Sequence, residues 1–321
     1  MKRRDFVKTT LPAAAMLRCF PAGLDAIARE TSGGGIERRA LGRTGEKLSI
    51  LGFGGIVVRD ATTEQAAARV RRAVEAGINY FDVAPSYGNA EEMLGPALEP
   101  YRKGVFLACK TQKRTRDEAN AELEQSLRRM RTDHFDLYQF HAVTKVQEVE
   151  AILGPGGAME AYQAARKAGK IRFIGFSAHS VEAALALMKG YDFDTILYPI
   201  NYATWHAGNF GPQVLEAARK KGMGILALKS MARQPWQDKA ERSRHPKCWY
   251  EPFDQPDDIL MGMRFTLSHP VTAAIPPGDE SIFEIALSVA PKFKPLTAKE
   301  AEEIKRKGLS TQPLFKFPAE G

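Results

Sequence analysis

From residue 36 to about residue 290, short apolar runs alternate with longer stretches that carry apolar residues at helical spacing. This alternation is typical of parallel α/β proteins, because consecutive parallel strands need a crossover connection that is usually a helix. Eight such pairs within about 290 residues predict a closed (β/α)8 barrel of the TIM type. The predicted strands are 48–54, 80–84, 105–110, 136–141, 171–177, 195–201, 224–229 and 272–275. The predicted helices that follow them are 63–76, 89–98, 116–130, 159–168, 181–189, 212–221, 257–267 and 281–290.

Two further elements are predicted outside the barrel. Residues 37–47 form a short basic β-hairpin ahead of the first strand, and residues 297–309 form an extra C-terminal helix. The alternative architecture is an open, doubly wound sheet, which would place the pattern G-x-G-x-x-G after its first strand. The glycines of residues 52–55 do not complete that pattern, so the closed barrel is favoured.

The first residues carry the pattern of an export signal. Lys2-Arg3-Arg4-Asp5-Phe6-Val7-Lys8 matches the twin-arginine motif, a modest apolar region follows, and Ala26-Ile27-Ala28 offers a cleavage site. We therefore expect residues 1–35 to be an export leader and linker, and residues 36–321 to form a single domain. The twin-arginine machinery would then deliver that domain to the periplasm. The alternative is a basic N-terminus that is not used for export, which would leave the protein in the cytoplasm.

Composition argues against several classes of protein. The chain is 44% hydrophobic and 26% charged, and no apolar run reaches the length of a membrane span. Its net charge of +8 is spread over groups such as Arg166-Lys167, which lack the interleaved aromatic residues of a nucleic-acid surface. The three cysteines show neither C-x-x-C spacing nor a metal-ligand cluster. A disulfide between Cys109 and Cys248 stays open, although a buried thiol at Cys109 is the simpler interpretation.

Polar residues lie where successive predicted strands end. Asp82 lies near the end of the second strand, Lys110 ends the third and His141 the fourth, while Tyr87 follows Asp82 after a short turn. Because alternate residues of a strand share a face, Gln139 lies on the same face as His141. If these faces point inward, the polar groups converge at the carboxyl end of the barrel, where barrel enzymes carry their chemistry. Each residue alone also has an ordinary interpretation, such as a cap carboxylate, a rim aromatic or a core histidine.

Taken together, Asp82, Tyr87, Lys110 and His141 resemble the catalytic tetrad of the aldo-keto reductases. The resemblance implies nicotinamide-dependent reduction of an aldehyde or ketone, or oxidation of the alcohol, with Tyr87 as the general acid. A phenol with a pKa of about 10 is a slow proton donor near neutrality. Lys110 is therefore expected to lower the pKa of Tyr87, with Asp82 holding Lys110 in place. His141 is expected to orient the carbonyl oxygen by donating a hydrogen bond.

The resemblance covers most of residues 36–290 and implies where the cofactor lies. Small residues around Gly55 would let the nicotinamide approach, and Ser177 would hold its carboxamide. The segment after the eighth strand would cradle phosphate and adenosine before a helix N-terminus. The predicted cradle residues are Ile275, Pro277 and Gly278.

Three features depart from the family pattern. Pro199 stands where the family commonly has glutamine, and Asn201 on the same strand face is the candidate to take over the carboxamide contact. Leu228 aligns with the aromatic residue that usually stacks on nicotinamide. The basic residues that often hold the 2′-phosphate are missing after the eighth strand, and Lys229 is the candidate to compensate at the pyrophosphate. The resemblance favours NADP(H), with NAD(H) as the alternative.

A long stretch, residues 232–256, follows the seventh strand. Loops of that length in a compact domain usually cover or line a binding site. Trp249 and Tyr250, together with Ile56 after the first strand, are the predicted contacts to a small carbonyl substrate that is aromatic or sugar-like. A structural cap over the barrel is the alternative.

Two other functions stay open. A barrel that binds nicotinamide as a sensor or regulatory subunit, with little turnover, would be consistent with Pro199 and Leu228 at the altered positions. A barrel aldolase would use Lys110 as a Schiff-base nucleophile. Because Asp82 would keep that lysine protonated, the aldolase is the weaker of the two alternatives.

Overall fold

The computed structural model describes residues 35–318, which form a closed barrel of eight parallel strands. A parallel bridge between Leu51 and Ala274 joins the first and last strands. There the Gly52 amide donates to the Ala274 carbonyl oxygen at 3.0 Å, and the Ala274 amide donates to that of Ile50 at 2.9 Å. The predicted TIM barrel is confirmed. Its strands are β3 (Phe53–Gly54), β4 (Tyr80–Asp82), β5 (Phe106–Thr111), β6 (Phe135–Val143), β7 (Ile171–Ala178), β8 (Thr195–Pro199), β9 (Gly224–Leu228) and β12 (Ala273–Ala274).

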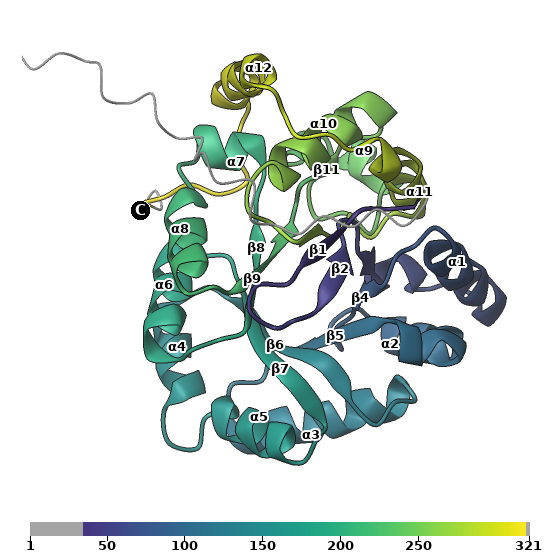
Figure 1. The fold of residues 1–321 in the computed structure, drawn as a ribbon, viewed down its shortest axis with the longest axis vertical. Coiled ribbons are helices and arrows are strands. Elements are labelled where there is room, and N and C mark those ends of the chain that lie inside the picture. Colours follow the sequence, from purple (N-terminus) through teal and green to yellow (C-terminus); the bar gives the residue numbers. More distant parts are fainter. Residues whose placement is uncertain (1–34, 319–321) are drawn as a thin grey trace, which may run out of the picture.

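Helices surround the barrel on its outer side (Figure 1). In α1 (Thr63–Glu75), Ala66, Val70 and Ala73 recur at helical spacing on the buried face, and a capping box at Thr62 begins the helix. The other helices of the ring are α2 (Ala90–Leu98), α3 (Arg116–Arg129), α5 (Ala158–Lys167), α6 (Val181–Gly190), α8 (Pro212–Lys220), α10 (Pro256–Leu267) and α11 (Glu280–Val289). Short 3-10 helices are η2 (Gly55–Val58), η3 (Glu99–Gly104) and η4 (Ala290–Lys292).

Apolar side chains fill the barrel interior toward the amino ends of the strands, and the predicted hairpin closes that end. The hairpin pairs β1 (Arg38–Ala40) with β2 (Lys47–Ser49) and contributes Leu41 and Leu48 to the interior cluster. Buried Arg39 anchors the hairpin by donating to two backbone carbonyl oxygens, at 2.8 and 3.0 Å. The rest of the interior cluster is Tyr80, Phe106, Ala108, Leu137, Leu197, Leu226, Ala273 and Ile275. The opposite end is therefore the one left open for polar groups.

The start of the barrel differs from the prediction. The strand predicted over 48–54 shrinks to β3, because Leu48 and Ser49 pair with β1 in the hairpin instead. An additional helix, α4 (Val146–Leu153), follows β6 ahead of α5 and was not predicted. Both differences leave the order of the barrel strands unchanged.

The sixth strand also ends earlier than predicted. The strand expected over 195–201 stops at Pro199, and a short helix, α7 (Tyr202–His206), begins three residues later. Asn201 causes this change, because its side-chain oxygen accepts hydrogen bonds from the amides two and three residues further on. A residue predicted as part of a strand is thus a helix cap.

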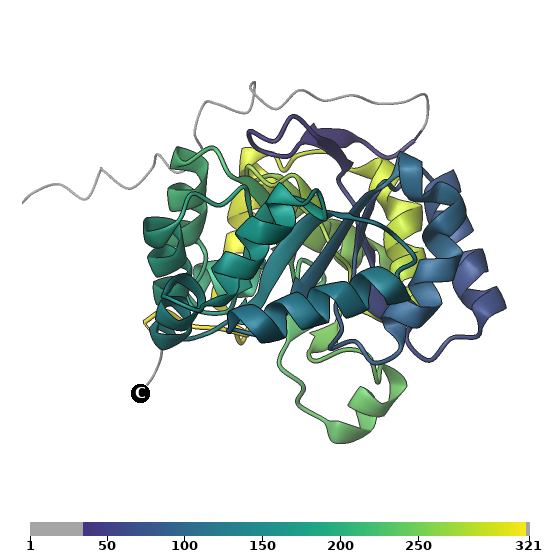
Figure 2. The same cartoon turned by 90° about the horizontal axis from the view of Figure 1, so that it is seen from below.

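Residues 232–256, called the mouth segment below, form a folded unit. The Trp236 indole nitrogen donates to the Cys248 carbonyl oxygen at 3.0 Å, which ties the two arms of the segment together. Figure 2 shows the segment in light green, protruding from the end of the barrel opposite the hairpin. Its elements are the antiparallel strands β10 (Ala232–Gln234) and β11 (Glu251–Pro252), with α9 (Lys239–Arg244) between them.

The C-terminal part returns to the barrel wall. The predicted final helix is α12 (Ala298–Leu309), which lies against α7 outside the ring. Beyond it, the Phe315 ring stacks on Phe210 with centroids 5.1 Å apart, and on His179 at 5.3 Å. The tail therefore forms part of the wall beside β7.

The predicted export leader lies outside the described residues, which begin at residue 35. Within residues 35–318, no helix has both the length and the apolar character needed to cross a bilayer. In the same range, no group of three or more His, Cys, Asp or Glu side chains is placed to hold a metal ion. Cys109 and Cys248 are both buried free thiols, so they do not form a disulfide.

Candidate active site

The predicted tetrad comes together at the carboxyl end of the barrel. Asp82 ends β4, Lys110 lies in β5, His141 lies in β6, and Tyr87 lies in the turn after β4. Lys110 forms an ion pair with the Asp82 carboxylate, and its Nζ lies 3.3 Å from the Tyr87 hydroxyl oxygen. One chain of contacts therefore runs from Asp82 through Lys110 to Tyr87.

Asp82 and Lys110 are buried, at 2% and 1% exposure, so removal of either would leave an unpaired charge in the interior. Two further groups support Asp82. The Tyr80 hydroxyl donates to Asp82 Oδ2 at 3.3 Å, and Gln139 Nε2 donates to the same oxygen at 3.1 Å. Sequence reasoning placed Gln139 on the inward face but did not include it in the site. The sequence did contain a signal for this role, because an inward-facing amide near a predicted buried carboxylate is a natural hydrogen-bond donor to it.

Burial and charge set the protonation of the site. Burial alone lowers the pKa of Lys110, but the negative charge and hydrogen bond of the Asp82 carboxylate outweigh it and raise that pKa above its usual value. For Tyr87, burial raises the pKa while the charge of Lys110 lowers it, and burial has the larger effect. The expected lowering by Lys110 is thus one contribution, but the net pKa of the phenol is raised. Near neutral pH the site holds a charged lysine beside a protonated tyrosine.

His141 meets the Tyr87 ring edge-on, with centroids 5.8 Å apart and an interplanar angle of 88°. Its Nδ1 lies 3.3 Å from Ser86 Oγ. Burial, followed by the positive charge of Lys110, holds the pKa of His141 well below its usual range. His141 is therefore neutral near pH 7, and a neutral imidazole has one N–H group to donate to an oxygen beside Tyr87.

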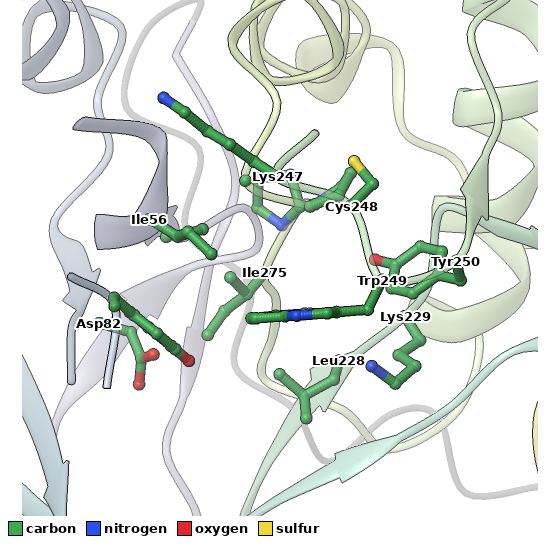
Figure 3. Close-up of a pocket in the computed structure, with 14 residues that line it drawn as sticks. Ile56, Asp82, Leu228, Lys229, Lys247, Cys248, Trp249, Tyr250 and Ile275 are labelled. Atoms are coloured by element: carbon green, nitrogen blue, oxygen red, sulfur yellow. The ribbon is translucent and has the colours of Figure 1, made fainter. Parts of the chain in front are cut away.

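A cavity opens at these side chains (Figure 3). Its two adjoining parts measure about 470 and 940 Å3, including the space open to solvent. Both parts are lined by Tyr87, Leu228, Lys229 and Trp249. The first part is also lined by Gly54, Ile56, Asp82, Lys247, Cys248, Tyr250, Ile275, Pro276, Pro277 and Gly278. The second is also lined by Ser86, Lys110, Gln112, His141, Ala142, Ser177, His179 and Leu197.

The predicted cradle residues border the first part of the cavity. Ile275, Pro277 and Gly278 all line it, as does Ile56, the predicted substrate contact. A Cβ atom on Gly278 would lie 2.4 Å from Ile56 Cγ2, so the backbone approaches Ile56 as closely as only glycine allows. Gly55 is not among the lining residues. A Cβ there would lie 2.8 Å from the side chain that follows β4, so this glycine serves the contact between η2 and β4.

The residues predicted to hold the carboxamide separate in the structure. Ser177 borders the second part of the cavity, and its Oγ accepts from the Ala142 amide at 2.7 Å, which leaves the hydroxyl hydrogen free to donate. Asn201 borders neither part. Its oxygen caps α7, and its Nδ2 donates to the Ala232 carbonyl oxygen at 2.6 Å. The structure therefore brings Ser177 to the cavity and keeps Asn201 away from it.

Lys229 lines both parts of the cavity, and it has no carboxylate partner among residues 35–318. It follows β9 with a left-handed φ of 64°. Its Nζ lies 4.8 Å from the Tyr250 ring centroid and 6.0 Å from that of Phe315. Burial lowers the pKa of Lys229 to about 8. A half-buried cation with aromatic neighbours and an open cavity in front of it is suited to an anionic ligand.

Trp249 and Tyr250 occupy different positions. Trp249 is 60% exposed, and its ring centroid lies 6.2 Å from that of Tyr87. Figure 3 shows the indole reaching across the cavity. Tyr250 is only 5% exposed and forms the wall beneath Lys229. Of these two aromatic residues, both predicted as substrate contacts, Trp249 is the one placed to meet a ligand at Tyr87.

These groups suit a nicotinamide dinucleotide better at its phosphate end than at its carboxamide end. Lys229 offers an unpaired cation, and the close approach at Gly278 leaves backbone rather than side chain at the cradle. At the carboxamide end, Ser177 is the remaining donor of the predicted set, because Asn201 is used by α7. The fit is therefore partial, and the phosphate contacts provide most of it.

The fold and the site define a TIM-barrel protein with a buried Asp–Lys–Tyr chain of contacts beneath an open cavity. Residues 50–302 match the Aldo/keto reductase family, and the chain belongs to this family. The resemblance noted in the sequence is thereby confirmed at the level of the family.

Relatives with curated names cover part of the chain. It is 28% identical over 215 residues to an L-galactose dehydrogenase from Arabidopsis thaliana, covering 61% of this chain and 66% of that protein. It is 27% identical over 218 residues to an NAD(P)H-dependent D-xylose reductase from Candida tenuis, covering 60% and 66%. The match thus spans just under two thirds of each relative.

A solved structure of an aldo-keto reductase from Bacillus halodurans, in its holo form, is similar to this chain with a TM-score of 0.69. The sequences are 21% identical, and the match covers 88% of this chain and 98% of that one. At this level of identity, the similarity supports the fold.

Proposed function

We propose that this protein transfers hydride between a nicotinamide cofactor, NADP(H) or NAD(H), and a carbonyl compound or its alcohol. The observation that carries the proposal is the Tyr87 hydroxyl, which lies 3.3 Å from Lys110 Nζ at the edge of an open cavity. The ion pair between Lys110 and Asp82 holds that arrangement. Membership of the family supports the same class of reaction.

The cofactor, when bound, supplies or accepts the hydride. Tyr87 donates its proton to the carbonyl oxygen as negative charge develops there, or accepts a proton from the alcohol in the reverse direction. Lys110 stays protonated, since its pKa lies above its usual value, and its charge stabilises the phenolate that Tyr87 leaves behind. The neutral His141 donates the hydrogen bond that holds the substrate oxygen beside Tyr87.

For the cofactor, we assign phosphate contacts to Lys229 and to the backbone at Gly278, and the carboxamide contact to the Ser177 hydroxyl. Ile275 and Pro277 complete the cradle. These assignments use the groups that face the cavity with hydrogen-bonding capacity to spare. NADP(H) is the favoured cofactor of the two.

For the substrate, we propose an aromatic or sugar-like aldehyde or ketone. Trp249 is exposed beside Tyr87, so a compound held at Tyr87 can place a flat or apolar face against the indole. Ile56 offers an apolar surface in the first part of the cavity. Both relatives described above are named for sugars, which favours a sugar.

A second candidate is a barrel that binds nicotinamide with little turnover. The engagement of Asn201 in a helix cap favours it, because the carboxamide end then lacks one predicted donor. Leu228 at the position of the stacking aromatic favours it further. A Schiff-base aldolase is disfavoured, because Lys110 is ion-paired and stays protonated rather than nucleophilic.

A Tyr87→Phe variant tests the proposal. The substitution removes the proton donor and keeps the ring, so kcat should fall by about 100- to 10,000-fold while the affinity for cofactor stays the same. Steady-state rates on a panel of sugar and aromatic carbonyl compounds, with cofactor titrations alongside, provide the measurement. Full turnover in the variant would refute the role of Tyr87. Tight cofactor binding by the wild type without turnover on the whole panel would favour the sensor.

For the N-terminal leader, we propose export of the folded protein with its cofactor already bound, because free nicotinamide cofactors are not expected outside the cytoplasm. Retained cofactor would then cycle between one substrate that is oxidised and another that is reduced. Mass spectrometry of protein from a periplasmic fraction should find cofactor released on denaturation. Cofactor-free protein in that fraction, or protein confined to the cytoplasm, would contradict this proposal.

A further inference from the structure

Cations from segments that lie far apart in the sequence gather beside the cavity, and of these Lys247 lines it. Lys247 comes from the mouth segment, Arg59 follows η2, and Arg69 lies on α1. Lys247 Nζ and Arg69 Nη1 donate to the same oxygen, the Val57 carbonyl, at 3.2 and 3.0 Å. Burial, followed by the charges of Arg69 and Arg59, lowers the pKa of Lys247. Two cations on one carbonyl oxygen repel each other, and an anion placed between them would relieve that repulsion.

The neighbouring carboxylates do not supply that anion, because each already has a partner. Lys247 itself has the Val57 carbonyl oxygen and no carboxylate among residues 35–318. The pairs around it are Arg69 with Glu280, Arg59 with Asp60 at 3.2 Å, and His245 with Asp279 at 2.9 Å. Lys247 is therefore the cation of this group that has no carboxylate partner among residues 35–318.

Lys247 lies on the part of the cavity that contains the phosphate cradle. It lines this part together with Ile56, Pro277 and Gly278. Figure 3 shows Lys247 and Lys229 on opposite sides of the cavity, with their ammonium groups pointing apart. The cavity thus offers two separate cationic positions. NADP(H) carries phosphate at two separate positions as well, the pyrophosphate and the 2′-phosphate of its adenosine.

We propose that Lys247, with Arg69 behind it, binds the 2′-phosphate of NADP(H), so that the mouth segment selects the cofactor. The inference rests on the proposed function. It accounts for the acidic residues Asp279 and Glu280 directly after the cradle, which pair with His245 and Arg69. A carboxylate free to bind a ribose 2′-hydroxyl would favour NAD(H), but both of these are engaged.

Calorimetric titrations of the purified full chain with NADPH and NADH test this assignment. Lys247→Met should weaken NADPH binding by about ten-fold or more and change NADH binding by less than about two-fold, because one charge-assisted contact to phosphate is lost. Arg242→Met is the matched control. Arg242 is exposed on α9 of the same segment, so neither affinity should change. Lys247→Arg, which keeps the charge, should keep the preference for NADPH.

The same pattern is expected with 2′,5′-ADP and 5′-AMP, which lack the nicotinamide. Lys247→Met should weaken the binding of 2′,5′-ADP and leave that of 5′-AMP nearly unchanged. Equal losses of NADPH and NADH affinity in Lys247→Met would indicate that Lys247 contacts the pyrophosphate, which both cofactors share. That result would overturn the assignment to the 2′-phosphate. Unchanged NADPH affinity, or a wild type that prefers NADH, would overturn it too. In all three cases the proposed function stands, since cofactor binds. Failure of the wild type to bind either nucleotide would refute the proposed function and this assignment together.

Discussion

Two lysines face the same cavity under opposite conditions. Lys110 is almost fully buried, forms an ion pair with Asp82, and has a pKa above its usual value. Lys229 is half-buried over the Tyr250 ring, has no carboxylate partner among residues 35–318, and has a pKa that burial lowers to about 8. The protein neutralises the first charge itself and leaves the second for a ligand.

This difference separates two tasks within one site. The charges around Lys110 are arranged in advance for proton transfer, which is the arrangement that lowers a reaction barrier without reorganisation. The charge of Lys229 is unfavourable until an anion arrives, so it contributes to binding. Substitutions at the two positions should therefore differ: loss of Lys110 should mainly reduce stability and turnover, and loss of Lys229 should mainly weaken cofactor binding.

The largest effect is expected for Lys110→Met. The variant leaves Asp82 charged and unpaired in the interior, which should reduce the free energy of unfolding by about 3–5 kcal/mol. It should also abolish most turnover, because Tyr87 loses the neighbouring charge. Urea unfolding and steady-state kinetics provide the measurements. Adding Asp82→Asn should restore part of the stability but not the activity. If Lys110→Met alone were as stable as the wild type, the distinction between the two lysines would not hold.

Lys229→Met should behave in the opposite way. Loss of the unpaired cation should weaken NADPH and NADH binding alike, by about ten-fold or more, since the contact is to a phosphate group that both share. Stability should stay the same or rise, because a half-buried charge without a carboxylate partner among residues 35–318 is removed. Calorimetry and thermal melts test both parts. A loss of stability similar to that of Lys110→Met would show that Lys229 has a structural partner after all.

The lowered pKa of Lys229 also predicts that stability and cofactor affinity depend on pH. The pKa of Lys229 falls from 10.5 to about 8 on folding, so the unfolded chain binds more protons than the folded one between those pH values. The contribution of this group to stability therefore increases as the pH rises through that window. Cofactor affinity should change in the other direction, because the ammonium form binds phosphate and is lost above about pH 8. Titrations at about pH 7 and about pH 9.5 should show weaker binding at the higher pH in the wild type, and little change in Lys229→Met.

A smaller effect is expected for Gln139→Leu. It removes one of the two neutral donors to Asp82, which should cost about 1 kcal/mol of stability and a few-fold in kcat. The cost is limited because the buried Gln139 Oε1 accepts no hydrogen bond from the described residues, 35–318. Tyr80→Phe removes the other donor, at the longer distance of 3.3 Å, and should cost less. A larger loss at Tyr80 than at Gln139 would reverse the order of the two supports.

The sequence predicted the strand ends well and the contacts between distant segments poorly. Asp82, Lys110 and His141 could be placed because each lies at or near the end of an apolar run, and the two-residue period of a strand fixes its face. Asn201 could not, because its side chain can either continue a strand or cap a helix, and the helix prevailed.

Lys247 illustrates a stronger limit. Its ammonium group meets Val57, 190 residues earlier in the chain, and that contact depends on how the mouth segment folds over the barrel. No local pattern encodes such a contact. The resemblance to the family therefore pointed only to missing phosphate contacts after the eighth strand, whereas the structure supplies a candidate cation from elsewhere.

The most direct test of the proposed function is a fluorescence titration of the purified full chain with NADPH and NADH, after mass spectrometry of any cofactor that denaturation releases. Trp249 lines the cavity beside Tyr87, so a bound nicotinamide should change its emission. The structure predicts saturable binding of both nucleotides, tighter for NADPH, or cofactor already present in the purified protein. If neither nucleotide binds and none is released, the cavity is not a nicotinamide site, and this chain shares only the barrel with its family.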